Sequence, residues 1–336
     1  MAENGQNRPI EADLEINDDA HSTLDSVAGT SATSLTDSIR EFRQENGRTY
    51  HSLSAGKYWL PNDDPEQDRL DLQHHAHRLT WDGDLCVCPK KNGAKRVLDL
   101  GTGTGVWAME YADDHPDAEV IGVDLSPIQP DFVPSNCTFE VDDLEKDWTW
   151  SNKFDFIYGR AMLGCFADLQ SIIQKCYDNL EPGGYLEMHD GSFPIRCDDD
   201  TLKPDSVLLK VTEMVIEASA KLGRPINLSQ HYKVMFEKAG FADVQLLPYK
   251  WPTNHWPRNP KMKTIGRWSL ANTDGGWEGM WLALFSRGLG MSREEIMVLC
   301  EQSRKELRDP KIHAYWPVYC CYGKKPDTPK AAEGVA

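Results

Sequence analysis

The chain has 336 residues, of which 40% are hydrophobic and 26% charged, and its formal net charge is −17. A surface this acidic repels phosphate backbones, so we expect no direct nucleic-acid partner. No apolar run reaches the roughly 20 residues of a membrane helix, no secretory signal is apparent, and nine cysteines are too few for a disulfide scaffold, so we expect no membrane association and a cytoplasmic or nuclear location.

The two ends of the chain differ in composition from its middle. Residues 1–45 are polar and acidic, and 26–34 are almost all small. Such segments bury too little apolar surface to offset the entropy lost on ordering, so we predict disorder for 1–45 and for the tail 326–336. A helix is predicted to follow from Asp64, which can act as its N-cap, with Pro65 suited to the first helical position.

From residue 96 onward, strand-like and helix-like patterns alternate. Strands are predicted over 96–100, 119–124, 137–141, 154–158, 185–188, 244–249 and 315–322, with a turn at 181–184. Strands separated by helices at this spacing imply right-handed βαβ units and a parallel α/β sheet. Helical insertions are predicted over about 200–240 and 251–310, which places the main domain at 46–325.

The first of these strands leads into a glycine-rich turn with glycines at 101, 103 and 105. The dinucleotide fingerprint G-x-G-x-x-G requires its third glycine at position 106, which is valine here. Asp99 lies two residues before the first glycine, and its carboxylate would repel a pyrophosphate group. It suits a ligand with an ammonium and a sulfonium group, which indicates S-adenosylmethionine.

Further carboxylates follow the next two strands. Asp124 ends the second strand, where it can accept hydrogen bonds from ribose hydroxyls, and Asp142 and Asp143 end the third, where a carboxylate can accept from an adenine amino group. Each could instead be a helix cap or a surface acid. Their joint order and spacing favour a methyl-donor site at the carboxyl edge of the sheet.

Five segments together resemble the class I S-adenosylmethionine-dependent methyltransferases: LDLGTGTGVWA, VIGVDLSPIQP, FEVDDLEKDWTW, FDFIYGRAMLG and LEPGGYLEMHD. The segments YWLPNDDPEQDRLDLQHH and DLSPIQP resemble, more narrowly, the fungal LaeA-like methyltransferases linked to secondary metabolism. The resemblance covers about residues 50–325. It implies a Rossmann-like seven-stranded sheet, mostly parallel with an antiparallel last strand, an N-terminal helical segment and an aromatic-rich helical cap.

The resemblance also implies a set of cofactor-binding residues. Those at the glycine turn would surround the methionine part, those after the second strand the ribose and those after the third strand the adenine. An arginine after the fourth strand and three residues of the N-terminal helical segment would complete the site. The full set is Tyr58, Arg69, His74, Asp99, Gly101, Thr102, Gly103, Gly105, Asp124, Leu125, Asp142, Asp143, Leu144 and Arg160.

Methyl transfer from a sulfonium mainly requires that the acceptor be aligned and water excluded, and a general base is needed only if the acceptor must lose a proton. His189, at the end of the fifth strand, is a candidate base, although it could equally be a strand-end residue with a structural role; His255 is a second candidate. No metal site is predicted, because Cys86 and Cys88 lack the spacing of common zinc motifs.

Two functions remain open. Tryptophans at 251, 256, 268, 277 and 281 suggest a lid over an apolar or planar small molecule, which indicates an enzyme of fungal secondary metabolism. The alternative is a LaeA-like nuclear regulator that binds the methyl donor and acts through a protein complex, with the acidic N-terminal segment as its docking arm. An NAD-dependent reductase is disfavoured by Asp99 and by the valine at position 106.

Overall fold

The computed structural model describes residues 9–13 and 41–327. The predicted disorder therefore falls largely outside the described residues. Where the two overlap, the structure differs from the prediction: Arg43–Glu45 forms strand β1, which pairs antiparallel with β2 (Arg48–Tyr50). Residues 9–13 lie against residues 256–258, where the amide of Asp13 donates to the carbonyl of Trp256 at 2.8 Å.

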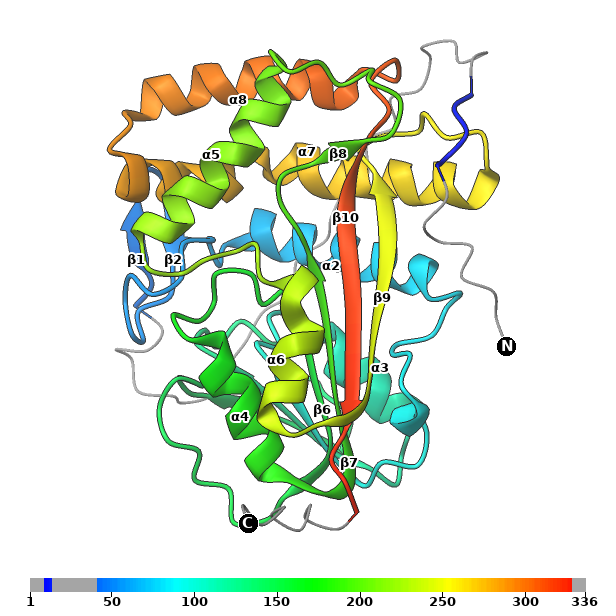
Figure 1. The fold of residues 1–336 in the computed structure, drawn as a ribbon. Coiled ribbons are helices and arrows are strands. Elements are labelled where there is room, and N and C mark those ends of the chain that lie inside the picture. Colours follow the sequence, from blue (N-terminus) through cyan, green and yellow to red (C-terminus); the bar gives the residue numbers. More distant parts are fainter. Residues whose placement is uncertain (1–8, 14–40, 328–336) are drawn as a thin grey trace, which may run out of the picture.

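A mixed sheet forms the lower body of the molecule (Figure 1), in the order β5-β4-β3-β6-β7-β10-β8, with β9 paired to β10. Strands β5, β4, β3, β6 and β7 are parallel, whereas β10 is antiparallel to β7, β8 and β9. The seven-stranded arrangement with an antiparallel last strand is thus confirmed, and the short β8 is added to it. The bounds are β3 (Arg96–Leu100), β4 (Glu119–Asp124), β5 (Cys137–Val141), β6 (Phe154–Arg160), β7 (Leu180–Gly191), β8 (Arg196–Cys197), β9 (Ala242–Pro252) and β10 (Ala314–Lys324).

The central strands read as continuous apolar runs because helices cover both faces of the sheet. Helix α3 (Val106–Asp114) covers one face, and α4 (Leu169–Asn179) and α6 (Tyr232–Ala239) cover the other (Figure 1). The predicted turn at 181–184 lies inside β7, where Gly183 has a φ of +80° and the register with β6 shifts. A strand with a local irregularity thus replaces the turn.

The N-cap of helix α2 (Asp64–Thr80) lies one residue earlier than predicted. Its N-cap is Asp63, whose side chain accepts from the amide of Glu66, so that the predicted capping residue Asp64 is the first helical residue. The helix lies across the carboxyl edge of the sheet and contacts the cap helix α7.

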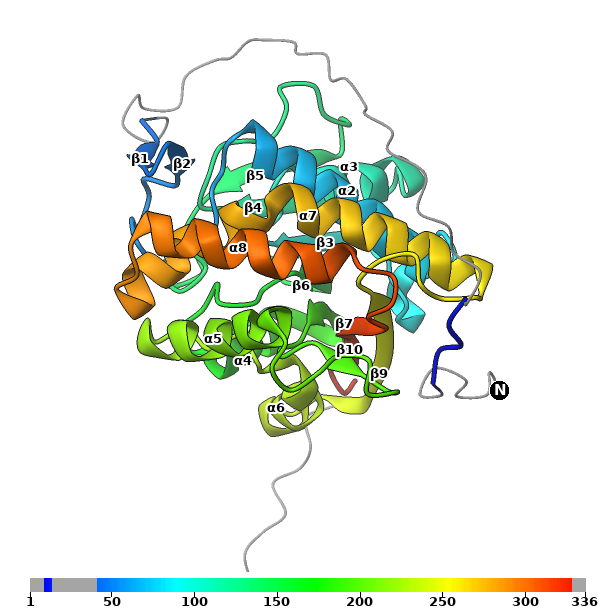
Figure 2. The same ribbon diagram turned by 90° about the horizontal axis from the view of Figure 1, so that it is seen from above.

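Helices α5 (Val207–Lys221), α7 (Pro260–Leu289) and α8 (Arg293–Arg308) form the cap. Figure 1 shows α8, α7 and α2 at successively lower levels above the sheet. Figure 2, seen from above, shows the three helices side by side, with α5 next to α8. The cap has its own apolar core, in which α5, α7 and α8 pack on Trp251 and Trp316 from β9 and β10. The helical region predicted over about 200–240 is divided into α5, the 3₁₀ turn η3 (Ser229–His231) and α6. Another 3₁₀ turn, η2 (Pro89–Lys91), lies earlier in the chain. Among the described residues, none of the helices is both long and apolar enough to cross a membrane.

Candidate functional site

A pocket of about 260 Å³ opens between the carboxyl edge of the sheet and the cap. One end is polar and is lined by the glycine turn after β3, by the residues after β4 and β5, and by the segment before α2. The other end is apolar and is lined by α5, α7 and β10. Of the cofactor-binding residues expected from the sequence, those that line this pocket are Tyr58, Arg69, Gly101, Gly103, Asp124, Leu125, Asp142, Asp143, Leu144 and Arg160.

The glycine turn is held by two carboxylates. Asp124 accepts from the amides of Gly103 and Ser126, both at 2.9 Å. Asp99 accepts from the hydroxyl of Thr102 at 2.6 Å, and both residues border a small adjoining pocket. The positive φ of Gly103, +59°, explains why the turn requires glycine there.

Gly105 has a packing role. It does not border either pocket, and a Cβ atom there would lie 2.4 Å from the ring of Phe139. With its φ of +81°, the residue must be glycine for α3 to begin where it does. The expectation that Gly105 surrounds the methionine part of the cofactor stays a prediction, and the structure gives this residue a packing role besides.

Burial raises the pKa of Asp99 from its ordinary value of 3.8 to about 7 and that of Asp124 to about 6. Hydrogen bonds from Thr102 and from the amides of Gly103 and Ser126 oppose the shift without cancelling it. A cation bound here would favour the ionised carboxylates. The carboxylates of Asp99 and Asp124 therefore fit a ligand that brings positive charge to the glycine turn.

The carboxylates after β5 already have hydrogen-bond partners within the protein. Asp143 accepts from the hydroxyl of Ser54 at 2.6 Å and from the ammonium of Lys57 at 2.5 Å. Burial opposes ionisation of Asp143, but the bonds from Lys57 and Ser54 hold its pKa below the ordinary value. Asp142 accepts from the amide of Asp143 at 2.7 Å. Ser54 and Lys57 were not expected from the sequence, because they come from a loop about 90 residues away.

Two residues of α2 have structural partners. Arg69 forms an ion pair with Glu66 at 2.8 Å and donates to Asn272 of α7 at 2.8 Å, so that it connects α2 to the cap. His74 does not line the pocket. It contacts Glu110 of α3 at 3.0 Å, and burial lowers its pKa to about 2, which leaves it neutral. Its side chain points toward α3, and its contact with the cofactor stays a prediction.

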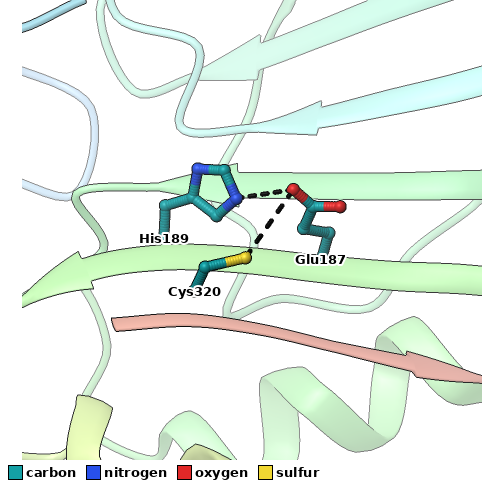
Figure 3. Close-up of side chains that lie close together, drawn as sticks. All are labelled: Glu187, His189 and Cys320. Carbon is teal, nitrogen blue, oxygen red and sulfur yellow. Dashed lines mark hydrogen bonds and ion pairs between the residues drawn. The ribbon is translucent and has the colours of Figure 1, made fainter. Parts of the chain in front are cut away.

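His189 borders the pocket, but both of its ring nitrogens have partners. Nε2 lies 2.5 Å from a carboxylate oxygen of Glu187 (Figure 3). Nδ1 lies 3.1 Å from the hydroxyl of Tyr158. Glu187 also accepts from the amides of Val87 and Cys88, at 2.8 and 2.6 Å. His189 could take a proton from an acceptor only by breaking one of its bonds, so the geometry favours a positioning role.

Glu187, His189 and Cys320 bring three metal-ligating atoms within 4.8 Å of one another. All three side chains are fully buried, and the Cys320 thiol lies 3.9 Å from Glu187 (Figure 3). The two oxygens of Glu187 already accept three hydrogen bonds from the protein. The arrangement is that of a buried hydrogen-bonded cluster, and the absence of a metal site remains a prediction that elemental analysis of the purified protein would check.

Three of the five expected tryptophans line the apolar end of the pocket, namely Trp251, Trp277 and Trp281. Trp256 donates from Nε1 to the carbonyl of Ala314, and Trp268 packs on His75, so neither lines it. The structure adds lining residues that the sequence reasoning missed: Trp59, Phe193, Val215, Ile226, Met280 and Trp316. Their apolar character alone could not separate them from ordinary core residues.

Comparison with known proteins assigns the family. A family model described as a methyltransferase domain matches residues 72–246. Methyltransferase pytC of Aspergillus terreus is 38% identical over 314 residues, which cover 93% of this chain and 96% of pytC. Secondary metabolism regulator LAE1 of Cochliobolus heterostrophus is 36% identical over 84% of this chain and 94% of its own. The chain belongs to the LaeA-like class I methyltransferases.

The cofactor of this methyltransferase is S-adenosyl-L-methionine, whose sulfonium and ammonium groups are cations of the kind that the glycine turn fits.

A third relative, laeA of Emericella nidulans, is described as a protein-methionine methyltransferase. It is 33% identical over 85% of this chain and 77% of its own.

The affinity of the methyltransferase for S-adenosylmethionine should rise by about tenfold between pH 5 and 7.5, because Asp99 and Asp124 ionise in this range and attract the cation. In the protein without cofactor, a rise in pH has the opposite effect on the free energy of unfolding, which decreases. A raised pKa means that the folded state keeps protons that the unfolded state loses, so stability falls from pH 3.8 to about 7. Calorimetric titration at both pH values checks the affinity. Asp99→Asn should reduce the pH dependence, and an unchanged wild-type affinity would contradict the prediction.

Proposed function

We propose that this methyltransferase transfers a methyl group to a small apolar acceptor of fungal secondary metabolism. The observation that carries the proposal is a single pocket with both Asp124 and Trp281 in its lining. A methyl donor at the polar end would thus share one pocket with an acceptor at the apolar end. Proximity in a water-excluding site is what this chemistry requires.

We assign the cofactor to the polar end of the pocket. Asp99, Gly101, Thr102 and Gly103 would hold its methionine part, and Asp124 with Leu125 its ribose. Tyr58, Asp142, Asp143, Leu144 and Arg160 would complete the site. When bound, the cofactor supplies an activated methyl group on a sulfonium sulfur. Arg69, through its contacts with Glu66 and Asn272, would hold α2 and the cap closed over that group.

A LaeA-like regulator acting through a protein complex is the second candidate, and it rests on the similarity to LAE1 and laeA. In this role the acidic N-terminal segment would be the docking arm. The match to pytC covers 93% of this chain at 38% identity, whereas the matches to LAE1 and laeA cover 84% at 36% and 85% at 33%. Together with the apolar end of the pocket, this favours the small-molecule enzyme.

One labelling experiment separates the two candidates. The purified protein is incubated with methyl-labelled S-adenosylmethionine and extracts of a fungal strain that lacks the gene, and the label is followed into small-molecule and protein fractions. We expect label in an organic-soluble product with wild type and none with Asp124→Ala. Label confined to protein, with partners that co-purify, would support the regulator instead. No label in either fraction would contradict the proposal.

A further inference from the structure

We propose that the apolar end of the pocket recognises an uncharged aromatic molecule carrying a carbonyl-type oxygen, and that the indole N–H groups of Trp281 and Trp316 donate hydrogen bonds to this oxygen. The inference rests on the proposed function, since it names the acceptor class for the same pocket. It is carried by the aromatic walls, by two unpaired donors and by the distribution of charge.

Four aromatic side chains form a contiguous wall. Trp281 lies 5.2 Å from Trp277 and 6.1 Å from Phe193, measured between ring centroids. Trp316 lies 5.8 Å from Phe193 and 6.2 Å from Trp277. All four line the pocket. Such surfaces bind planar aromatic ligands well, because rings pack on them in offset or edge-to-face geometry.

The indole N–H groups of four of the five pocket tryptophans fall into two classes. Trp251 donates to the hydroxyl of Thr80 at 2.8 Å, and Trp277 donates to the hydroxyl of Ser303 at 2.9 Å. The Nε1 atoms of Trp281 and Trp316 are buried, and neither has a partner among the described residues.

Buried polar groups normally have hydrogen-bond partners, and an unpaired one destabilises the protein. An indole N–H can only donate, so the group that satisfies it must be an acceptor. Two donors in an aromatic wall therefore indicate a ligand oxygen. The buried hydroxyls of Ser192 and Ser269, which line the same pocket, also lack partners and offer further contacts.

The charged side chains of the pocket lining disfavour an ionic group beside Trp281 and Trp316. Most of them come from strand ends or from the segment before α2, and Arg69 is paired with Glu66. Burial lowers the pKa of His51 and His77, so both rings are neutral. An ammonium or carboxylate group of a ligand packed among the tryptophans would lose its hydration, at high cost.

Three matched probes test the inference by calorimetry on the protein saturated with S-adenosylhomocysteine: 2-acetylnaphthalene, its carbonyl-free analogue 2-ethylnaphthalene, and the cationic 1-(2-naphthyl)ethylamine. We expect the ketone to bind about tenfold more tightly than the hydrocarbon, and the amine to bind most weakly. Trp281→Phe and Trp316→Phe keep an aromatic ring and remove the donor. Each should weaken ketone binding by about fivefold and change hydrocarbon binding less than twofold.

Trp81→Phe is the control, because Trp81 also has a buried unpaired indole N–H but does not line the pocket. It should leave the binding of all three probes unchanged. The inference is overturned if the hydrocarbon or the amine binds as tightly as the ketone, or if both pocket variants bind the ketone like wild type. Loss of S-adenosylhomocysteine binding in the folded wild type would instead overturn the proposed function, which keeps the two failures distinct.

Discussion

Asp124→Ala should weaken S-adenosylmethionine binding at least tenfold, which corresponds to about 1.4 kcal/mol. The carboxylate lies at the end of β4 and accepts from the amides of Gly103 and Ser126, so its loss removes both the expected ribose contact and the support of the glycine turn. Isothermal calorimetry measures the affinity directly. Asp124→Asn, which keeps one accepting oxygen, should lose less.

Asp155→Ala provides the matched control. Asp155 also accepts backbone amides, those of Lys95 and Arg96, but at the opposite end of the sheet. Its replacement should lower the melting temperature and leave cofactor affinity unchanged. If Asp124→Ala bound the cofactor like wild type while remaining folded, the assignment of the polar end would be wrong.

Glu187→Ala should be the most destabilising single change among those considered, at about 3–5 kcal/mol. The side chain is fully buried and accepts hydrogen bonds from two amides and from His189, so its removal leaves three polar groups without a partner. Thermal or denaturant unfolding followed by circular dichroism measures the loss. We expect a melting temperature lower by roughly 5 °C.

Glu110→Ala is the corresponding control, since Glu110 also has a histidine partner, His74, but is 41% exposed. An exposed pair of this kind contributes at most about 1 kcal/mol. Equal destabilisation by the two variants would show that burial of the Glu187 cluster has little effect on stability.

The sheet could be predicted because its signal is local. Each central strand is a short apolar run, and the positions after β3 and β4 carry glycine or aspartate for reasons that apply within a few residues. Asp124 and the glycine turn therefore come together as expected. The exact residue at which an element begins is harder to predict. At the start of α2, Asp63 and Asp64 have the same capping chemistry, and the structure uses Asp63.

The residues around the cap could not be predicted in this way. His74 lies on the same helix as the pocket residue Arg69. Only the packing of α2 on α3 and α7 decides that His74 contacts Glu110 and that Arg69 contacts Asn272. Trp316 lies in a strand that reads as ordinary core. Its place in the pocket depends on the pairing of β10 with β9, which brings together residues about 65 positions apart.

Strand β10 is shared by the sheet and the cap. It pairs with β7 beside the Glu187 cluster, continues to β8, and supplies Trp316 to the apolar end of the pocket. A chimera that imports a lid from a relative must therefore bring β9 and β10 in their original register, or the graft will disturb the sheet beneath it. Specificity is more readily redesigned by point changes on the pocket-facing side of α5 and α7, which leave the strand pairing intact.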